Sequence, residues 1–213
     1  MQQSIKIKVC GMKFAANIAE IAALKPDYMG FIFYDKSPRY ISTISSELIL
    51  YVPKEIKTVG VFVDEEAKMV KLKIATLGLQ VVQLHGKELP EYCAALKLDF
   101  PNVEIIKAFG VDEDFNFSDL SLYLEVVDFF LFDTKTTKHG GSGKQFDWTT
   151  LENYKLDKPY FLSGGIDLED LYAIKKINDK RLVAIDINSK FELEPGKKNV
   201  EKTKEIIAGL REI

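Results

Sequence analysis

FFLFDTKTTKHGGSGKQFDW, at residues 129–148, joins a wholly apolar run to the carboxylate of Asp133 and then to a glycine-rich loop. Consecutive apolar residues predict a strand that is buried on both faces, as in a parallel sheet. Ligands of α/β sheets bind where the strands end, and Asp133 lies at that end. The stretch therefore predicts one side of a binding site.

The segment GGSG at 140–143 predicts an anion site, with phosphate as the candidate anion. Glycine has no Cβ and tolerates positive φ, so the backbone N–H groups of such a loop can approach an anion closely. The alternative is a flexible Gly/Ser linker. That alternative loses weight because the loop lies inside one strand-to-helix connection, and no other Gly/Pro/Ser-rich tract divides the chain.

Length and composition are typical of one globular α/β domain, which we expect to span residues 1–213. The chain is 46% hydrophobic and 29% charged, and its net charge of -3 offers no basic surface for nucleic acid. Cys10 and Cys93 lie far apart and predict reduced thiols in a cytoplasmic protein. The N-terminus lacks the apolar stretch of a signal peptide, and no run of about 18 apolar residues predicts a membrane span.

Strand and helix patterns alternate along the chain. Short β-branched or aromatic runs predict strands at 5–9, 28–33, 58–63, 81–84, 103–108, 127–132, 160–162 and 182–187. Helical spacing occurs at 15–24, 46–51, 65–77, 89–96, 168–177 and 199–210, and more weakly at 114–122 and 148–154. Repeated βα units require parallel pairing with right-handed crossovers, and eight of them close into a (β/α)8 TIM barrel. An open doubly wound sheet is the alternative.

In a barrel, functional residues lie at the C-terminal ends of the strands. That rule selects Cys10, the loop 34–39, Asp64, His85 and Asp133. It also selects three segments around the last three strands, where barrels place a phosphate on backbone amides. These segments supply the candidate phosphate ligands Gly141, Ser142, Gly143, Ser163, Gly164, Gly165, Asn188 and Ser189.

An ordered set of short motifs resembles one enzyme family from the first strand to the last. The motifs are KVCG at 8–11, GFIF at 30–33, KSPRYI at 36–41, GVFV at 60–63, QLHG at 83–86, DTKT at 133–136, GGSGK at 140–144, FDW at 146–148 and LSGG at 162–165. They look like phosphoribosylanthranilate isomerases, (β/α)8 enzymes of tryptophan biosynthesis. The resemblance implies an Amadori rearrangement, in which N-(5'-phosphoribosyl)anthranilate opens its furanose ring and becomes 1-(2-carboxyphenylamino)-1-deoxyribulose 5-phosphate. It implies this phosphorylated small molecule as the partner and neither a metal nor an organic cofactor.

The resemblance also implies that Cys10 is the general base and Asp133 the general acid. A free thiol has a pKa of about 8.5, so a thiol base needs nearby positive charge or amide dipoles. The acid must keep its proton near neutral pH, which the apolar strand and a bound phosphate would favour. Lys135 would oppose this, so we expect it to point away from Asp133 or toward a substrate anion. Without the motif, Cys10 could equally be a small buried apolar residue. Asp133 could likewise be an ordinary aspartate that caps a loop at the end of a strand.

Arg39 matches the family position that binds the anthranilate carboxylate, which a guanidinium can hold through two parallel hydrogen bonds. Outside the KSPRY context it would be a solvated loop charge. His85 and Gln83 point the same way along the fourth strand, and we expect His85 at the rim, in contact with substrate or packing, rather than in proton transfer.

The chain departs from the family pattern after the eighth strand. It has Asn188, Ser189 and Lys190 where the family commonly has a Ser-Ser-Gly turn. The missing glycine removes one expected phosphate contact, for which the Asn188 amide or the Lys190 charge can substitute. The following EPGKK, at 194–198, again resembles the family and is expected to begin the last helix.

Three other functions fit a phosphate-binding barrel. The histidine-pathway isomerase looks to use two aspartates and two phosphate sites, so Cys10 and the lack of a GGSG-like loop in the first half argue against it. A barrel without catalysis would be expected to have lost one of Cys10, Arg39 and Asp133. Indole-glycerol-phosphate synthase looks longer and relies on a catalytic lysine. The sequence leaves the oligomeric state open between monomer and homodimer.

Overall fold

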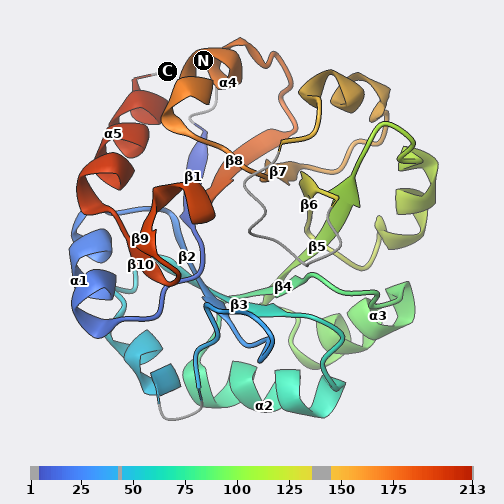
Figure 1. The fold of residues 1–213 in the computed structure, drawn as a ribbon. Helices are drawn as coiled ribbons and strands as arrows, with labels where there is room; N and C mark the ends of the chain where they lie inside the picture. The colour runs from blue at the N-terminus through green and yellow to red at the C-terminus, as the bar shows by residue number, and fades with distance from the viewer. Residues whose placement is uncertain (1–4, 43–44, 136–144, 213) are drawn as a thin grey trace.

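Eight parallel strands close into one barrel. The computed structural model describes residues 5–42, 45–135 and 145–212. Each strand pairs with its neighbours in chain order, and the first also pairs with the last (Figure 1). The strands are β1 Lys6–Val9, β2 Tyr28–Ile32, β3 Lys57–Phe62, β4 Val81–Leu84, β5 Glu104–Val111, β6 Phe129–Thr134, β7 Tyr160–Leu162 and β8 Leu182–Ile187. The predicted (β/α)8 barrel is confirmed, and the open sheet is excluded.

Helices surround the barrel on its outer side (Figure 1). The α-helices of the described residues are α1 Ala15–Ala23, α2 Ala67–Leu77, α3 Pro90–Asp99, α4 Leu171–Lys176 and α5 Val200–Arg211. None of these described helices has the length and apolar character needed to cross a membrane.

Three segments with helical spacing form 3-10 helices instead of α-helices. They are η1 Ser45–Tyr51, η2 Phe117–Tyr123 and η3 Trp148–Asn153. In η2 and η3, side chains at the start of the segment compete for the backbone, which disfavours a longer α-helix. Asn116 and Asp147 show this competition, because their side chains accept hydrogen bonds from the backbone N–H of Ser118 and Thr149. Two further 3-10 turns are present: η4 Leu168–Asp170 precedes α4, and η5 Ser189–Phe191 follows β8.

The expectation that residues 194–198 begin the last helix is wrong. They belong to a two-stranded antiparallel hairpin of β9 Glu192–Glu194 and β10 Lys197–Lys198. Gly196 adopts φ +91 in the turn, a conformation that glycine accepts without strain. Helix α5 begins only after Asn199, whose side chain caps it by accepting from the Lys202 N–H.

The inside of the barrel is filled by one cluster of side chains from alternate strand positions. Its members include Tyr28, Val59, Val61, Val81, Ile106, Ala108, Leu131, Phe161 and Ala184. Because side chains of a strand alternate between its faces, the residues two positions after Val81, Leu131 and Ala184 also point inward. Those residues are Gln83, Asp133 and Asp186, which places three polar groups at the C-terminal mouth of the barrel.

Candidate active site

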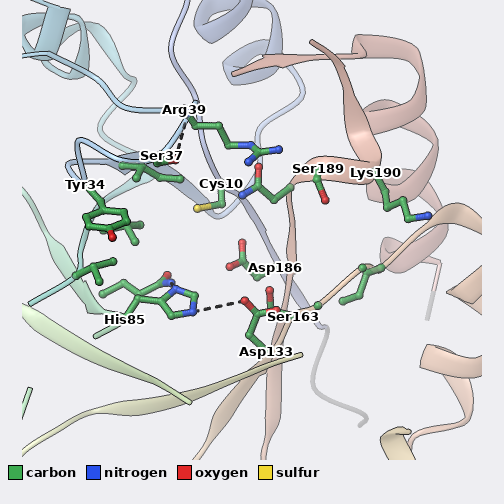
Figure 2. Close-up of a pocket in the computed structure, with 18 residues that line it drawn as sticks. Cys10, Tyr34, Ser37, Arg39, His85, Asp133, Ser163, Asp186, Ser189 and Lys190 are labelled. Carbon is green, nitrogen blue, oxygen red and sulfur yellow. Dashed lines mark hydrogen bonds and ion pairs between the residues drawn. The ribbon is translucent and has the colours of Figure 1, made fainter. Parts of the chain in front are cut away.

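The predicted catalytic and substrate-binding residues that the structure describes line one pocket at the C-terminal ends of the strands (Figure 2), whereas Asp64, which the strand-end rule also selected, does not line it. These are Cys10, Arg39, His85, Asp133, Ser163, Gly164, Gly165, Asn188 and Ser189. Gly141, Ser142 and Gly143 lie outside the described residues. Lys190, which stands where the family commonly has glycine, lines the same pocket, as do Gln83 and Asp186.

Cys10 follows β1 and is almost completely buried. Its backbone N–H donates to the Ile187 carbonyl at 2.9 Å, which ties the residue to the end of β8. A Cβ at Gly30 would lie 2.8 Å from the Cys10 Sγ, so the thiol occupies space that only glycine leaves open. Burial raises the pKa of the Cys10 thiol, and the charges of Lys8 and Lys198 oppose this rise. Two lysine charges therefore favour the thiolate, although burial is the larger effect and the pKa of Cys10 is raised overall.

Lys8 and Asp186 form a buried ion pair beside Cys10. Their strands pair in register, with Lys8 opposite Asp186, and the Lys8 Nζ lies 2.7 Å from the Asp186 Oδ2. Neither residue was among the site residues predicted from the sequence. The signal was available in the alternation of β1 and β8, because Lys8 shares the inward face with Cys10, and Asp186 shares it with Ala184.

Asp133 ends β6 and contacts His85, which follows β4. The His85 Nε2 lies 3.5 Å from the Asp133 Oδ2, and the Gln83 amide Nε2 lies 3.1 Å from the His85 Nδ1. The imidazole ring of His85 therefore lies between the Gln83 amide and the carboxyl group of Asp133. Lys135 pairs with Asp112 at 2.5 Å rather than with Asp133, as expected. His85 is thus a pocket residue that orients Asp133.

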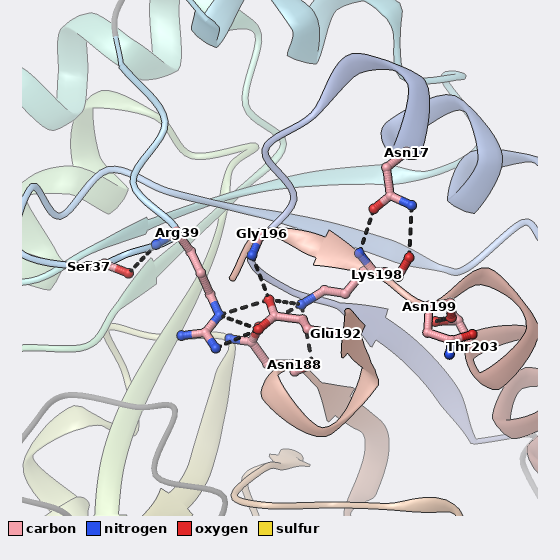
Figure 3. Close-up of polar contacts among 9 residues, drawn as sticks. All are labelled: Asn17, Ser37, Arg39, Asn188, Glu192, Gly196, Lys198, Asn199 and Thr203. Carbon is pink, nitrogen blue, oxygen red and sulfur yellow. Dashed lines mark hydrogen bonds and ion pairs between the residues drawn. The ribbon is translucent and has the colours of Figure 1, made fainter. Parts of the chain in front are cut away.

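Arg39 reaches the pocket from the loop after β2 and is held by Glu192 of β9 (Figure 3). The Arg39 Nε lies 2.9 Å from Oε1 and 3.1 Å from Oε2 of Glu192, and the Nη2 lies 2.6 Å from Oε2. Lys198 and the Gly196 N–H also donate to Oε1, at 2.7 and 3.0 Å. Burial opposes ionisation of Glu192, yet Arg39 and Lys198 hold its pKa below the usual range. Arg39 was predicted from the sequence, whereas Glu192 and Lys198 were not.

Lys198 connects this cluster to the candidate phosphate segment. Its Nζ donates to the Asn188 side chain Oδ1 at 2.7 Å, as well as to Glu192. Burial lowers the pKa of Lys198 to about 8, although Glu192 and Cys10 favour its charged form. Lys198 therefore fixes the loop that follows β8 and also neutralises the charge of Glu192.

The turn after β7 brings backbone close to Asp133. Gly164 and Gly165 adopt φ +96 and +67, which favour glycine. A Cβ on Gly164 would collide with Thr134 and come within 3.0 Å of the Asp133 Oδ1. The predicted phosphate segment at 163–165 thus lies beside Asp133, and Asn188 and Ser189 line the same pocket.

A closed (β/α)8 barrel with a thiol and a carboxyl group in one polar pocket defines a class of barrel enzymes that work by acid/base catalysis. The family model for N-(5'-phosphoribosyl)anthranilate (PRA) isomerase matches residues 7–208. The chain therefore belongs to the N-(5'-phosphoribosyl)anthranilate isomerase family. It is an isomerase of the aldose-ketose type that acts in tryptophan biosynthesis.

Similar proteins and similar solved structures are isomerases of the same family. The N-(5'-phosphoribosyl)anthranilate isomerase of Parabacteroides distasonis is 42% identical over 203 residues, which cover 94% of this chain and 91% of that protein. The crystal structure of the Thermotoga maritima isomerase has a TM-score of 0.84 and 32% identity, and covers 98% of this chain and 100% of its own. A second similar structure, with a TM-score of 0.82, 28% identity and coverage of 98% and 100%, is an isomerase in complex with reduced 1-(o-carboxyphenylamino)-1-deoxyribulose 5-phosphate. A further structure describes monomers of the dimeric T. maritima isomerase.

Proposed function

We propose that this pocket converts N-(5'-phosphoribosyl)anthranilate into 1-(2-carboxyphenylamino)-1-deoxyribulose 5-phosphate, with Asp133 as general acid and Cys10 as general base. The observation that carries the proposal is that these two groups, at the ends of β6 and β1, line the same pocket (Figure 2). An acid and a base that act on neighbouring atoms of one sugar must both be within reach of it. The reduced product bound to a related isomerase supports a ligand of this kind.

The reaction requires proton transfers that match these two groups. Asp133 donates its proton to the furanose ring oxygen as the bond between that oxygen and sugar C1 breaks, and the C1–N bond becomes a protonated imine. The Cys10 thiolate then takes the proton from sugar C2, and the electron pair of that bond moves to form the enolamine. Tautomerisation, in which C1 gains a proton and the C2 hydroxyl loses one, gives the ketone.

Arg39 and the segments after the last two strands would hold the two ends of the substrate. The Arg39 guanidinium suits the planar anthranilate carboxylate, and its contacts with Glu192 leave Nη1 for that purpose. Ser163, Gly164, Gly165, Asn188 and Ser189 would bind the phosphate together with the loop at 141–143. Contacts at both ends of the substrate would fix the reacting carbons within reach of Cys10 and Asp133.

We also propose that residues 1–213 act as a single catalytic domain in the cytoplasm, as a monomer or a homodimer. The eight strands of one barrel extend from Lys6 to Ile187, which supports one domain. Both Cys10 and Cys93 are free thiols, which supports a reducing compartment. The dimeric T. maritima isomerase supports the homodimer as one of the two states.

The test is loss of phosphoribosylanthranilate fluorescence, with the substrate generated in situ. The wild type should turn over, and Cys10→Ser and Asp133→Asn should each lower kcat by about 10²–10⁴-fold. Cys93→Ser, at the other buried thiol, should keep wild-type kcat. Unchanged kcat in either pocket variant would contradict the assigned role, and an inactive wild type would contradict the reaction.

A further inference from the structure

Asp186 lies between the two groups to which the acid and base steps are assigned (Figure 2). It ends β8, only 5% of it is exposed, and it lines the pocket together with Cys10 and Asp133. The two proton transfers assigned to Cys10 and Asp133 do not use it. The two proposed proton transfers therefore leave a buried carboxylate of this pocket without a role.

One oxygen of the Asp186 carboxylate accepts a hydrogen bond, and the other has no donor among the described residues. The Oδ2 accepts from the Lys8 Nζ at 2.7 Å, and Lys8 is itself completely buried. The Oδ1 is buried and has no hydrogen-bond partner among the described residues. A buried acceptor without a donor is costly, so a position of this kind is expected to receive a donor from a ligand.

The other buried ion pairs of the barrel differ from this one. Glu88 pairs with Lys107 at 3.1 Å, and its two oxygens also accept from the backbone N–H groups of Asp64 and Gly86. Glu192 likewise accepts at both oxygens. Those carboxylates are saturated, as expected of structural ion pairs. Asp186 is the pair member that faces the pocket and keeps an oxygen available.

The geometry points to Asp186 as a further catalytic residue, whose Oδ1 accepts a hydrogen bond from the hydroxyl on sugar C2, while Lys8 fixes the carboxylate through Oδ2. This inference rests on the proposed function. Cys10 removes the hydrogen from C2, so the hydroxyl on the same carbon must lie close to the thiol. Asp186 is the carboxylate beside that thiol, and its negative charge raises the pKa of Cys10, which the charge of Lys8 opposes.

This contact would help the reaction in two ways. It would orient C2 so that its hydrogen faces the Cys10 sulfur, because the hydroxyl and the hydrogen are held on one tetrahedral carbon. Asp186 would also accept a hydrogen bond from the C2 hydroxyl while the enolamine becomes the ketone. In that step the C2 oxygen loses its proton. Burial raises the pKa of Asp186, and the charge of Lys8, 2.7 Å away, opposes that rise.

A binding measurement tests the contact without relying on turnover. The two probes are reduced 1-(o-carboxyphenylamino)-1-deoxyribulose 5-phosphate, which carries an alcohol at C2, and the same compound without that hydroxyl. Wild type should bind the hydroxylated probe about 10- to 100-fold more tightly, as expected for a hydrogen bond to a charged group. Asp186→Asn should bind both probes within a factor of about three.

Glu104→Gln is the matched control. Glu104 also has a buried oxygen without a partner in the described structure and pairs with a lysine, Lys57 at 2.5 Å, but it begins β5 and does not line the pocket. This variant should discriminate between the probes as the wild type does. If Asp186→Asn prefers the hydroxylated probe as strongly as the wild type does, the inference is wrong.

A second variant guards against misfolding, because Asp186→Asn leaves the Lys8 charge buried without a partner. The double variant Lys8→Gln/Asp186→Asn replaces the ion pair with a neutral hydrogen-bonded pair of similar volume. It should fold, as judged by circular dichroism, and should show the same loss of discrimination. A double variant that folds and still discriminates would overturn the inference. Failure of the proposed function is distinguishable, because the wild type would then show no turnover of phosphoribosylanthranilate.

Discussion

Arg39 and Glu192 lie 153 residues apart in the chain, yet they form an ion pair with three close contacts at the edge of the pocket. The pair joins the loop after β2 to the hairpin after β8 (Figure 3). Glu192 occupies Nε and Nη2, which fixes the plane of the guanidinium before substrate arrives. Lys198 offsets the negative charge of Glu192, so that Arg39 keeps its attraction for a substrate carboxylate.

Glu192→Gln should therefore weaken substrate binding more than it slows the reaction. An amide accepts at one atom only, so the guanidinium loses its fixed plane, and KM should rise about tenfold, the loss of roughly one hydrogen bond. The change in kcat should stay within about threefold, since Arg39 lies away from the reacting carbons. Steady-state kinetics with the fluorescent substrate measure both quantities. Glu194→Gln, on the exposed part of the same hairpin, is the control, and an equal rise in KM there would contradict the account.

Lys198 should make the free energy of unfolding depend on pH. Its pKa is lowered to about 8 in the folded protein from an ordinary value of 10.5, so the unfolded chain binds more protons between these values. Stability should therefore rise with pH across that window, by about 1.4 kcal/mol per pH unit for this group. Below pH 8 both states carry the proton, and this contribution is flat.

Urea unfolding of wild type and Lys198→Met from pH 6 to 10 isolates that contribution from other titrating groups. The difference in unfolding free energy between the two proteins should be constant below about pH 7 and should shift by about 2 to 3 kcal/mol in favour of the wild type by pH 10. A constant difference over the whole range would show that Lys198 titrates normally in the folded state.

His85 should act through Asp133. Replacing it with alanine removes the ring that contacts the Asp133 Oδ2 and leaves Gln83 without its partner. The loss of one orienting contact should lower kcat by about five- to tenfold, with little change in KM. Combining His85→Ala with Asp133→Asn provides the check, because the second change should make the first almost silent. Fully additive losses would mean that His85 works independently of Asp133.

Gly164 should be intolerant of a side chain. At φ +96, alanine is strained, and its Cβ would collide with Thr134. We expect Gly164→Ala to lower the free energy of unfolding by about 2 to 4 kcal/mol and to raise KM. Gly78, at φ +63 after α2, has open space around the position of a Cβ, so Gly78→Ala should cost only about 1 kcal/mol. Equal costs in urea unfolding would mean that the close approach at Gly164 has no effect.

The barrel was predictable from sequence because its strands are dominated by local signals. The apolar run that forms β6 and the alternating helices were sufficient to predict parallel pairing. The end of β5 was missed, because residues 109–111 extend the strand only through pairing with Phe132, Asp133 and Thr134. Helix type in the short connections was also missed, since local side-chain hydrogen bonds determine it.

The site was predictable where one residue carries the signal and not where two distant residues share it. Cys10, Asp133 and Arg39 stand in recognisable motifs at strand ends. Lys8 and Asp186 are 178 residues apart, and nothing local indicates that one neutralises the other. Glu192 and Lys198 were missed for a different reason, because residues 194–198 were expected to begin a helix, whereas they form the hairpin that pairs Glu192 with Lys198.

The central claim is that Asp133 opens the ring and Cys10 removes the C2 hydrogen, and the most direct test is the isotope effect on kcat for substrate deuterated at sugar C2. Cys10→Ser should show a large primary isotope effect, because removal of that hydrogen becomes the slow step. Asp133→Asn should show none, because ring opening becomes slow and precedes it. The reverse pattern, or the same isotope effect in both variants, would contradict the assignment of base and acid.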